Sequence, residues 1–209
     1  FALDGEGGVE TAELIEDEST IQMGIGGVPY AVSRFLKDKK DLGVHTEMFT
    51  EGMLELYEAG VITNRKKTLF PDKFVAAFAF GTQRLYDFIN DNPSVYIMRG
   101  SYTNDPNIIG QNHKMVSINT ALMIDLTGQV CSEAIGTRHY SGTGGQLDTH
   151  RGAIQSQING LGGKGIISIR STAKGKSKIV PVLPTGSPVT VPRQDLDYIV
   201  TEYGIAHMR

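Results

Sequence analysis

A glutamate stands where a strand pattern gives way to a helical one, in the segment GVHTEMFTEGMLELYEAG. Residues 42–46 predict a short strand, residues 50–59 have amphipathic helical spacing, and Glu47 lies between them. A carboxylate at the carboxyl end of a strand faces the crevice in which open α/β sheets bind ligands. Glu47 is therefore a candidate nucleophile or general base, and a buried ion-pair partner is the structural alternative.

Two glycine-rich segments could present backbone N–H groups to a ligand. In MGIGGVP, Gly26 and Gly27 follow a predicted strand and precede a predicted helix, which suits contact with an anion or a thioester. The spacing fits neither the dinucleotide fingerprint nor a P-loop, and tight strand–helix packing is the alternative. In SGTGGQLD, Gly144 and Gly145 could form an oxyanion hole, unless the segment is a mobile surface loop.

The remaining reactive residue types form weaker patterns. The segment STAKGKSK holds three lysines, which suit either a phosphate-bearing ligand or a solvated turn. His45 and Glu47 form only an H-x-E pair, and neither an H-E-x-x-H helix nor a Cys/His cluster with ligand spacing occurs, so no metal site is predicted. Cys131 is the only cysteine, which excludes an internal disulfide, and a small buried residue is the simpler interpretation.

Composition narrows the class of protein. The chain has 209 residues, of which 40% are hydrophobic, enough for a substantial core in one large or two small domains. A formal net charge of −3 does not favour nucleic acid, and no apolar run is long enough to span a bilayer. The start, FALDGEGG, lacks the features of a signal peptide. We expect residues 1–8 to be a linker stub or a cloning remnant.

Strand and helix patterns alternate along the chain. This alternation predicts an α/β fold with an open, largely parallel sheet flanked by helices. The apolar run KFVAAFAFG is expected to be a strand covered on both faces, and residues 121–126 and 129–136 are expected to form a hairpin. Helices are expected at residues 9–17, 30–39, 50–59 and 82–90, and further strands at 20–23, 94–100, 114–119, 163–170, 177–183 and 197–204.

Seven segments together resemble the acetyl-CoA hydrolase/transferase family. They are MGIGGVPYAV, GVHTEMFTEGMLELYEAGVI, GTQRLYDF, INTALMIDLTGQVCSEAIG, SGTGGQLDTHRGA, STAKGKSKIVPVL and DYIVTEYGIAHMR. The segment GVPYAV has a proline and in this resembles the loop of the 4-hydroxybutyrate and butyrate:acetate CoA-transferase subgroup. The resemblance implies that residues 9–209 are the C-terminal catalytic domain of a class I CoA-transferase fold, truncated at its C-terminal end and lacking the N-terminal domain.

The resemblance also implies a mechanism. In this family a glutamate of a T-E motif attacks the acyl-CoA thioester, and a glutamyl-CoA thioester forms by way of a mixed anhydride. The motif HTEM places that role on Glu47, SGTGG places the oxyanion donor at Gly145, and TNDP places a carboxylate-orienting side chain at Asn104. The implied cofactor-binding residues are Gly26, Gly27, Gly144, Lys174 of the Thr-Ala-Lys turn, and Glu202 of VTEYG.

The expected function is transfer of CoA from a short-chain acyl-CoA to a carboxylic acid such as acetate, 4-hydroxybutyrate or butyrate. Two alternatives stay open, namely acetyl-CoA hydrolysis at the same site and a non-catalytic CoA-binding module. Coenzyme A is expected as a substrate rather than as a permanent cofactor. The expected partners are acyl-CoA, a short-chain carboxylate, the family's N-terminal domain and a second copy of the chain, without nucleic acid or membrane. A bacterial cytoplasm is expected, although a mitochondrial relative would look alike.

Overall fold

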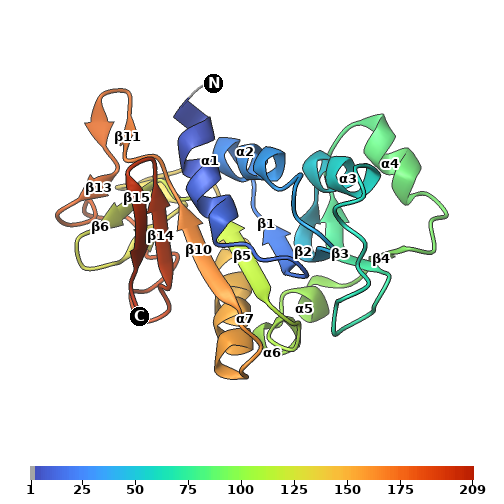
Figure 1. Cartoon of the computed structure of the whole chain (residues 1–209). Coiled ribbons are helices and arrows are strands. Elements are labelled where there is room, and N and C mark those ends of the chain that lie inside the picture. Colours follow the sequence, from blue (N-terminus) through green and yellow to red (C-terminus); the bar gives the residue numbers. More distant parts are fainter. Residues whose placement is uncertain (1–2) are drawn as a thin grey trace.

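An eight-stranded sheet forms the centre of the molecule (Figure 1). The structure is a computed structural model that describes residues 3–209, with the backbone alone described for residues 3–6. Neighbouring strands pair parallel throughout, except the antiparallel pair β14–β15. The predicted open, largely parallel α/β fold is thereby confirmed. The strand order is β15 (Gly204–His207), β14 (Tyr198–Thr201), β10 (Lys164–Ser168), β5 (Met115–Asn119), β1 (Thr20–Met23), β2 (Gly43–Phe49), β3 (Phe74–Ala79), β4 (Val95–Ile97).

Two groups of helices cover the sheet. Figure 1 shows α1 (Leu3–Glu13), α2 (Gly27–Phe35) and α3 (Glu51–Glu58) side by side, with α4 (Gln83–Ile89) beyond them. The second group consists of α5 (Gly100–Thr103), α6 (Pro106–Ile109) and α7 (Gln146–Ile158). Side chains alternate along β5 accordingly, because successive residues of a strand point to opposite faces. Val116 and Ile118 join the large core that includes residues of α1, α2 and α3, whereas Met115 packs with Ile109 and Ala153 of α6 and α7.

Short strands beyond the main sheet complete the fold. β6 (Met123–Asp125) and β7 (Val130–Cys131) pair antiparallel around a turn at Gly128, which confirms the predicted hairpin, and β13 (Ile179–Val180) adds a third strand. Two further hairpins are formed by β8 (Ala134–Ile135) with β9 (Arg138–His139), and by β11 (Thr172–Ala173) with β12 (Lys176–Ser177). The β11–β12 hairpin stands out beyond the end of β10 (Figure 1).

The first helix begins earlier than the sequence predicts. It begins at Leu3 instead of residue 9, so the expected stub is largely helical. Its glycines are poor helix formers, but they allow close packing, since a Cβ at Gly8 would lie 3.0 Å from the Phe35 ring. Thr11 ties the helix to β10 by donating a hydrogen bond of 2.9 Å to Ser168 Oγ. Tertiary packing therefore outweighs local propensity here.

Two strands also differ from the predictions in ways that bear on the site. β2 runs to Phe49 instead of ending at residue 46, so Glu47 lies inside the strand. The expectation that the KFVAAFAFG run is covered on both faces is wrong for its second half. Phe74 is fully buried, but Phe78 and Phe80 are 45% and 70% exposed.

Candidate active site

Glu47 is the one residue of β2 whose side chain is only partly buried. The strand lies between β1 and β3 in the sheet, and Glu47 precedes its end at Phe49 by two residues. Neighbouring parallel strands end at the same edge of a sheet, so loops from several elements meet around this carboxylate. Strand β2 thus presents one accessible carboxylate among otherwise buried residues.

A backbone N–H group holds that carboxylate. The amide nitrogen of Gly145 donates a hydrogen bond of 3.0 Å to Oε2 of Glu47. Gly145 is the N-cap residue of α7, a helix of 13 residues whose amino end carries partial positive charge. Its φ of −91° is available to any residue, so glycine is required here by space. A Cβ at this position would lie 2.6 Å from Glu47 Oε2 and 2.4 Å from Asn104 Nδ2.

Asn104 lies against the same glycine, as the Cβ geometry at Gly145 shows. It caps the carboxyl end of α5, and its backbone N–H donates to Gly100 O at 2.9 Å. Within residues 3–209 no hydrogen bond joins Asn104 to Glu47, and the buried Asn104 Oδ1 has no partner. The structure therefore brings together the three residues predicted to be catalytic, Glu47, Gly145 and Asn104.

The carboxylate opens into a cleft of about 400 Å³. Gly144 lines it with a φ of +55°, a backbone conformation that favours glycine. The predicted contribution of Gly26 and Gly27 is not found in the lining, where Gly24 and Ile25 stand instead, because α2 begins at Gly27 and Gly26 is its N-cap. The other lining residues are Gln22, Met23, Met48, Phe78, Asn119, Thr120, Ser132, Ser141, Gly142, Thr143, Gly145 and Gln146.

Lys174 and Glu202 lie outside this cleft lining, near the end of β10. Lys174 forms the turn of the β11–β12 hairpin, where its side chain is exposed and its φ is +50°. Glu202 follows β14 and accepts hydrogen bonds from the backbone N–H of Ser171 at 2.9 Å and from Ser171 Oγ at 2.5 Å. Burial alone would raise the pKa of the Glu202 carboxyl, but these hydrogen bonds, together with the backbone N–H of Glu202 and the positive charge of Arg170, outweigh it and lower that pKa. Glu202 thereby anchors the chain that leads into the hairpin.

Sequence reasoning missed a buried polar network beneath the cleft. Ser117 Oγ and Asn119 Nδ2 donate to Gln22 Oε1 at 2.8 and 3.2 Å, and both also reach Thr149 Oγ1 on α7. All four side chains are buried. Two polar residues alternating at the end of the apolar strand KMVSIN are a signal that could have indicated it. The network ties the first turn of α7, whose N-cap is Gly145, to β1 and β5.

A second carboxyl group near Glu47 was also missed. Asp148 lies in the first turn of α7 and is partly buried. Burial raises the pKa of Asp148, and the negative charge of Glu47 raises it further, while Arg151 opposes both effects. Among the described side chains, residues 7–209, no group of three or more His, Cys, Asp or Glu is arranged to hold a metal ion.

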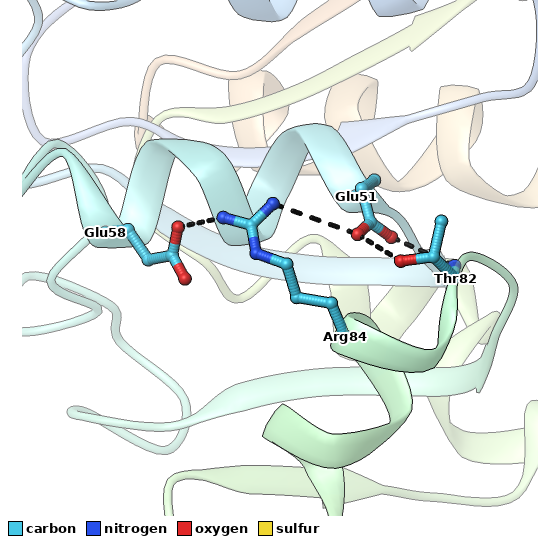
Figure 2. Close-up of polar contacts among 4 residues, drawn as sticks. All are labelled: Glu51, Glu58, Thr82 and Arg84. Carbon is cyan, nitrogen blue, oxygen red and sulfur yellow. Dashed lines mark hydrogen bonds and ion pairs between the residues drawn. The ribbon is translucent and has the colours of Figure 1, made fainter.

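The helices after β2 and β3 are held together by a polar cluster (Figure 2). Glu51, the first residue of α3, accepts hydrogen bonds from Thr82 Oγ1 at 2.7 Å and from the Thr82 backbone N–H at 3.2 Å. Arg84 lies between Glu51 and Glu58 and forms ion pairs with both. Because Thr82 is the N-cap of α4, the cluster fixes the loop that follows Phe78, one wall of the cleft.

Comparison with known proteins identifies the family. The family described as "Acetyl-CoA hydrolase/transferase C-terminal domain" matches residues 81–209. The chain belongs to the acetyl-CoA hydrolase/transferase family. The resemblance inferred from the seven segments is thereby confirmed. In the part of the chain that the structure describes, no helix is long and apolar enough to cross a membrane.

Relatives in this family include transferases and hydrolases. The 4-hydroxybutyrate coenzyme A transferase of Clostridium kluyveri is 54% identical over 204 residues, which are 97% of this chain and 47% of the relative. A crystal structure of 4-hydroxybutyrate CoA-transferase from Porphyromonas gingivalis superposes with a TM-score of 0.85 at 44% identity, covering 100% of this chain and 48% of that one. An acetyl-CoA hydrolase of Kluyveromyces lactis is 27% identical over 208 residues, 98% of this chain and 38% of the relative. The chain thus spans about half, or less, of the length of these relatives.

Proposed function

We propose that the protein is a CoA-transferase that moves CoA from a short-chain acyl-CoA to a carboxylate, through a glutamyl-CoA thioester on Glu47. The observation that carries the proposal is the hydrogen bond from the Gly145 N–H to Glu47 Oε2 at the edge of an open cleft. The similarity to CoA-transferases supports it. We further propose that residues 9–209 act as the C-terminal catalytic domain of a longer enzyme. A cytoplasmic location and a homo-oligomer stay predictions.

The proposed reaction proceeds in balanced steps. An oxygen of Glu47 attacks the thioester carbonyl carbon, the C–S bond breaks, and CoA leaves as a thiolate while an acyl–glutamyl anhydride remains on the protein. The thiolate then attacks the Glu47 carbonyl carbon, which releases the first carboxylate and leaves glutamyl-CoA. A second carboxylate reverses both steps and departs as the new acyl-CoA. No net proton is transferred, so this scheme needs no separate general base.

Gly145 has a defined role in these steps. When the thiolate adds to the Glu47 carbonyl carbon, negative charge develops on the glutamate oxygen. The N–H group that already contacts Oε2 can stay on that oxygen, with the amino end of α7 behind it. We propose that Asn104 orients the carboxylate, that Gly144 approaches the reacting carbonyl, and that Lys174 and Glu202 belong to the CoA-binding end of the site.

Hydrolysis is the second candidate function, because the family includes an acetyl-CoA hydrolase. It uses the same glutamate, with water completing the reaction in place of an acid. We favour transfer because a thioester intermediate persists only where water is kept away from it.

Intact-mass spectrometry tests the proposal. The full-length protein is mixed with butyryl-CoA and its intact mass is measured, and a second portion is reduced with borohydride, which turns a glutamyl thioester into an alcohol and releases CoA, and is then digested, with the Glu47→Ala variant as control. The expected results are a CoA-sized adduct before reduction that added acetate discharges to acetyl-CoA, and a reduced residue that maps to Glu47. Discharge in buffer alone, or thioester consumption without an adduct, would identify a hydrolase. Neither adduct nor consumption would leave a CoA-binding module.

A further inference from the structure

His45 is a buried histidine two residues before Glu47. Its side chain is 1% exposed, and Nε2 lies 2.9 Å from the carbonyl oxygen of Thr103. A carbonyl oxygen only accepts hydrogen bonds, so Nε2 must carry the proton. Nδ1 is buried without a partner within residues 3–209, which fits the neutral ring with a proton on Nε2 alone. Burial is also the main reason that the pKa of His45 is lowered to about 4.

The bond reaches a helix end that has little support of its own. α5 has only four residues and Thr103 is its last, so the Thr103 carbonyl accepts no hydrogen bond from within the helix. A helix this short is not stable by itself and takes its position from tertiary contacts. His45 supplies such a contact by donating to that carbonyl. The next residue after Thr103 is Asn104, which lies against Gly145.

Residues 45–47 of β2 lie beside residues 103–104 at the end of α5. His45 and Glu47 point to the same face of β2, about 7 Å apart along the strand, because side chains alternate. Thr103 and Asn104 are consecutive, so the hydrogen bond from His45 to the Thr103 carbonyl also restrains the backbone of Asn104. Asn104 in turn lies against Gly145, whose N–H donates to Glu47. Within residues 3–209 His45 makes no hydrogen bond to Glu47, Gly145 or Asn104 and does not line the cleft. The hydrogen bond that links His45 to the neighbourhood of Asn104 is the one to the Thr103 carbonyl.

We propose that His45 is a positioning residue that anchors the end of α5 through Thr103 and thereby places Asn104 beside Glu47 and Gly145. The kinetic part of this inference rests on the proposed function. The structural part does not, because the bond and the position of Asn104 can be measured in the resting protein.

The kinetic test compares three variants of the full-length protein. His45→Met removes the donor at similar side-chain length, whereas His45→Gln keeps an N–H near the position of Nε2. Asn64→Gly is the matched control, because it removes a buried hydrogen bond of 2.8 Å to the Val44 N–H in the same strand without touching α5. Asn64 has a φ of +59°, which glycine adopts without strain.

Misplacement of a supporting group can cost about 100-fold in rate. His45→Met is therefore expected to slow glutamyl-CoA formation from saturating butyryl-CoA by about that factor, with unchanged CoA affinity. His45→Gln is expected to restore most of the rate, and Asn64→Gly to lower the thermal midpoint with the rate unchanged. Equal rates for His45→Met and Asn64→Gly would overturn the proposal, as would failure of His45→Gln to rescue.

The structural test needs no activity. Nitrogen-15 spectra of His45 are expected to show the neutral Nε2–H tautomer, and a proton on Nδ1 would contradict the assignment. Amide hydrogen exchange at Asn104 is expected to accelerate in His45→Met beyond Asn64→Gly, and equal exchange would contradict the anchor. If the unmutated protein forms no CoA adduct, the proposed function fails, and this exchange comparison alone decides the role of His45.

Discussion

The N–H of Gly145 and the carboxylate of Glu47 meet at 3.0 Å, although 98 residues separate them in the chain. Three features of the fold bring them together. β2 carries Glu47 to the edge of the sheet, Gly145 caps the amino end of α7, and the network from Thr149 to Ser117 and Asn119 ties the first turn of α7 to β5. The contact is close enough that no side chain fits at residue 145.

We predict that Gly145→Ala abolishes most of the transfer activity while the protein stays folded. The added Cβ would lie 2.6 Å from Glu47 Oε2, so the carboxylate or α7 must move away from the N–H donor. Loss of one oxyanion donor costs about 100- to 1,000-fold in kcat, which is the expected range here. Steady-state transfer from butyryl-CoA to acetate measures it.

Gly100→Ala is the control for this substitution. Gly100 has no positive φ, and a Cβ there would meet nothing within 4 Å. Its activity and thermal midpoint should match those of the unmutated protein. A Gly145→Ala variant with full activity would show that the close contact between residues 145 and 47 has no part in the reaction.

Local patterns in the sequence were enough to predict the sheet. The alternation of apolar runs with amphipathic stretches gives β1 at Thr20–Met23 as predicted, and α3 and α4 within one residue at each end. These elements bury their apolar faces in the way that periodicity requires. Helix α1 was misjudged because close glycine packing on α2, a tertiary effect, decides its start.

Residue patterns alone were enough to make Glu47 and Gly145 candidates. The family resemblance assigned their roles and added Asn104, and the structure adds the proximity of the three residues. Gly26 and Gly27 lie outside the cleft lining because α2 starts at Gly27, earlier than the sequence predicts, and their contact with a ligand stays a prediction. The roles of Asp148 and Gln22 depend on which distant residues the fold brings beside them, and spacing along the chain does not carry that information.

The polar cluster between α3 and α4 leads to a prediction on stability. Glu51→Ala removes two hydrogen bonds at the amino end of α4, one of them to the Thr82 backbone N–H, and is expected to cost about 1–2 kcal/mol. Arg84→Ala removes ion pairs whose arginine side chain is 50% exposed, and is expected to cost less than about 1 kcal/mol. Urea unfolding of both variants measures the difference. A larger loss for Arg84→Ala would mean that the ion pairs in Figure 2 dominate the cluster.

Two buried histidines should make the fold sensitive to mild acid. Burial is the main cause that lowers the pKa of His45 and of His150 to about 4, from an ordinary value of 6.5. Between pH 6.5 and 4 the unfolded chain binds protons at these residues that the folded chain does not. The stability that neutral burial provides is therefore complete above pH 6.5 and is lost as pH falls towards 4.

We predict a slope of about 1 kcal/mol per pH unit for each of these histidines between pH 6 and 5. The His150→Met variant isolates one of them. As pH falls, its free energy of unfolding should decrease less steeply than that of the unmutated protein, and the two slopes should differ by the contribution of one histidine. Asp148 acts in the opposite direction, since its pKa is raised, but both proteins carry it and the comparison cancels it. Urea unfolding at half-unit steps of pH measures the two slopes. Parallel slopes would mean that His150 takes up a proton in the folded protein as readily as in the unfolded chain, against the effect expected of its complete burial.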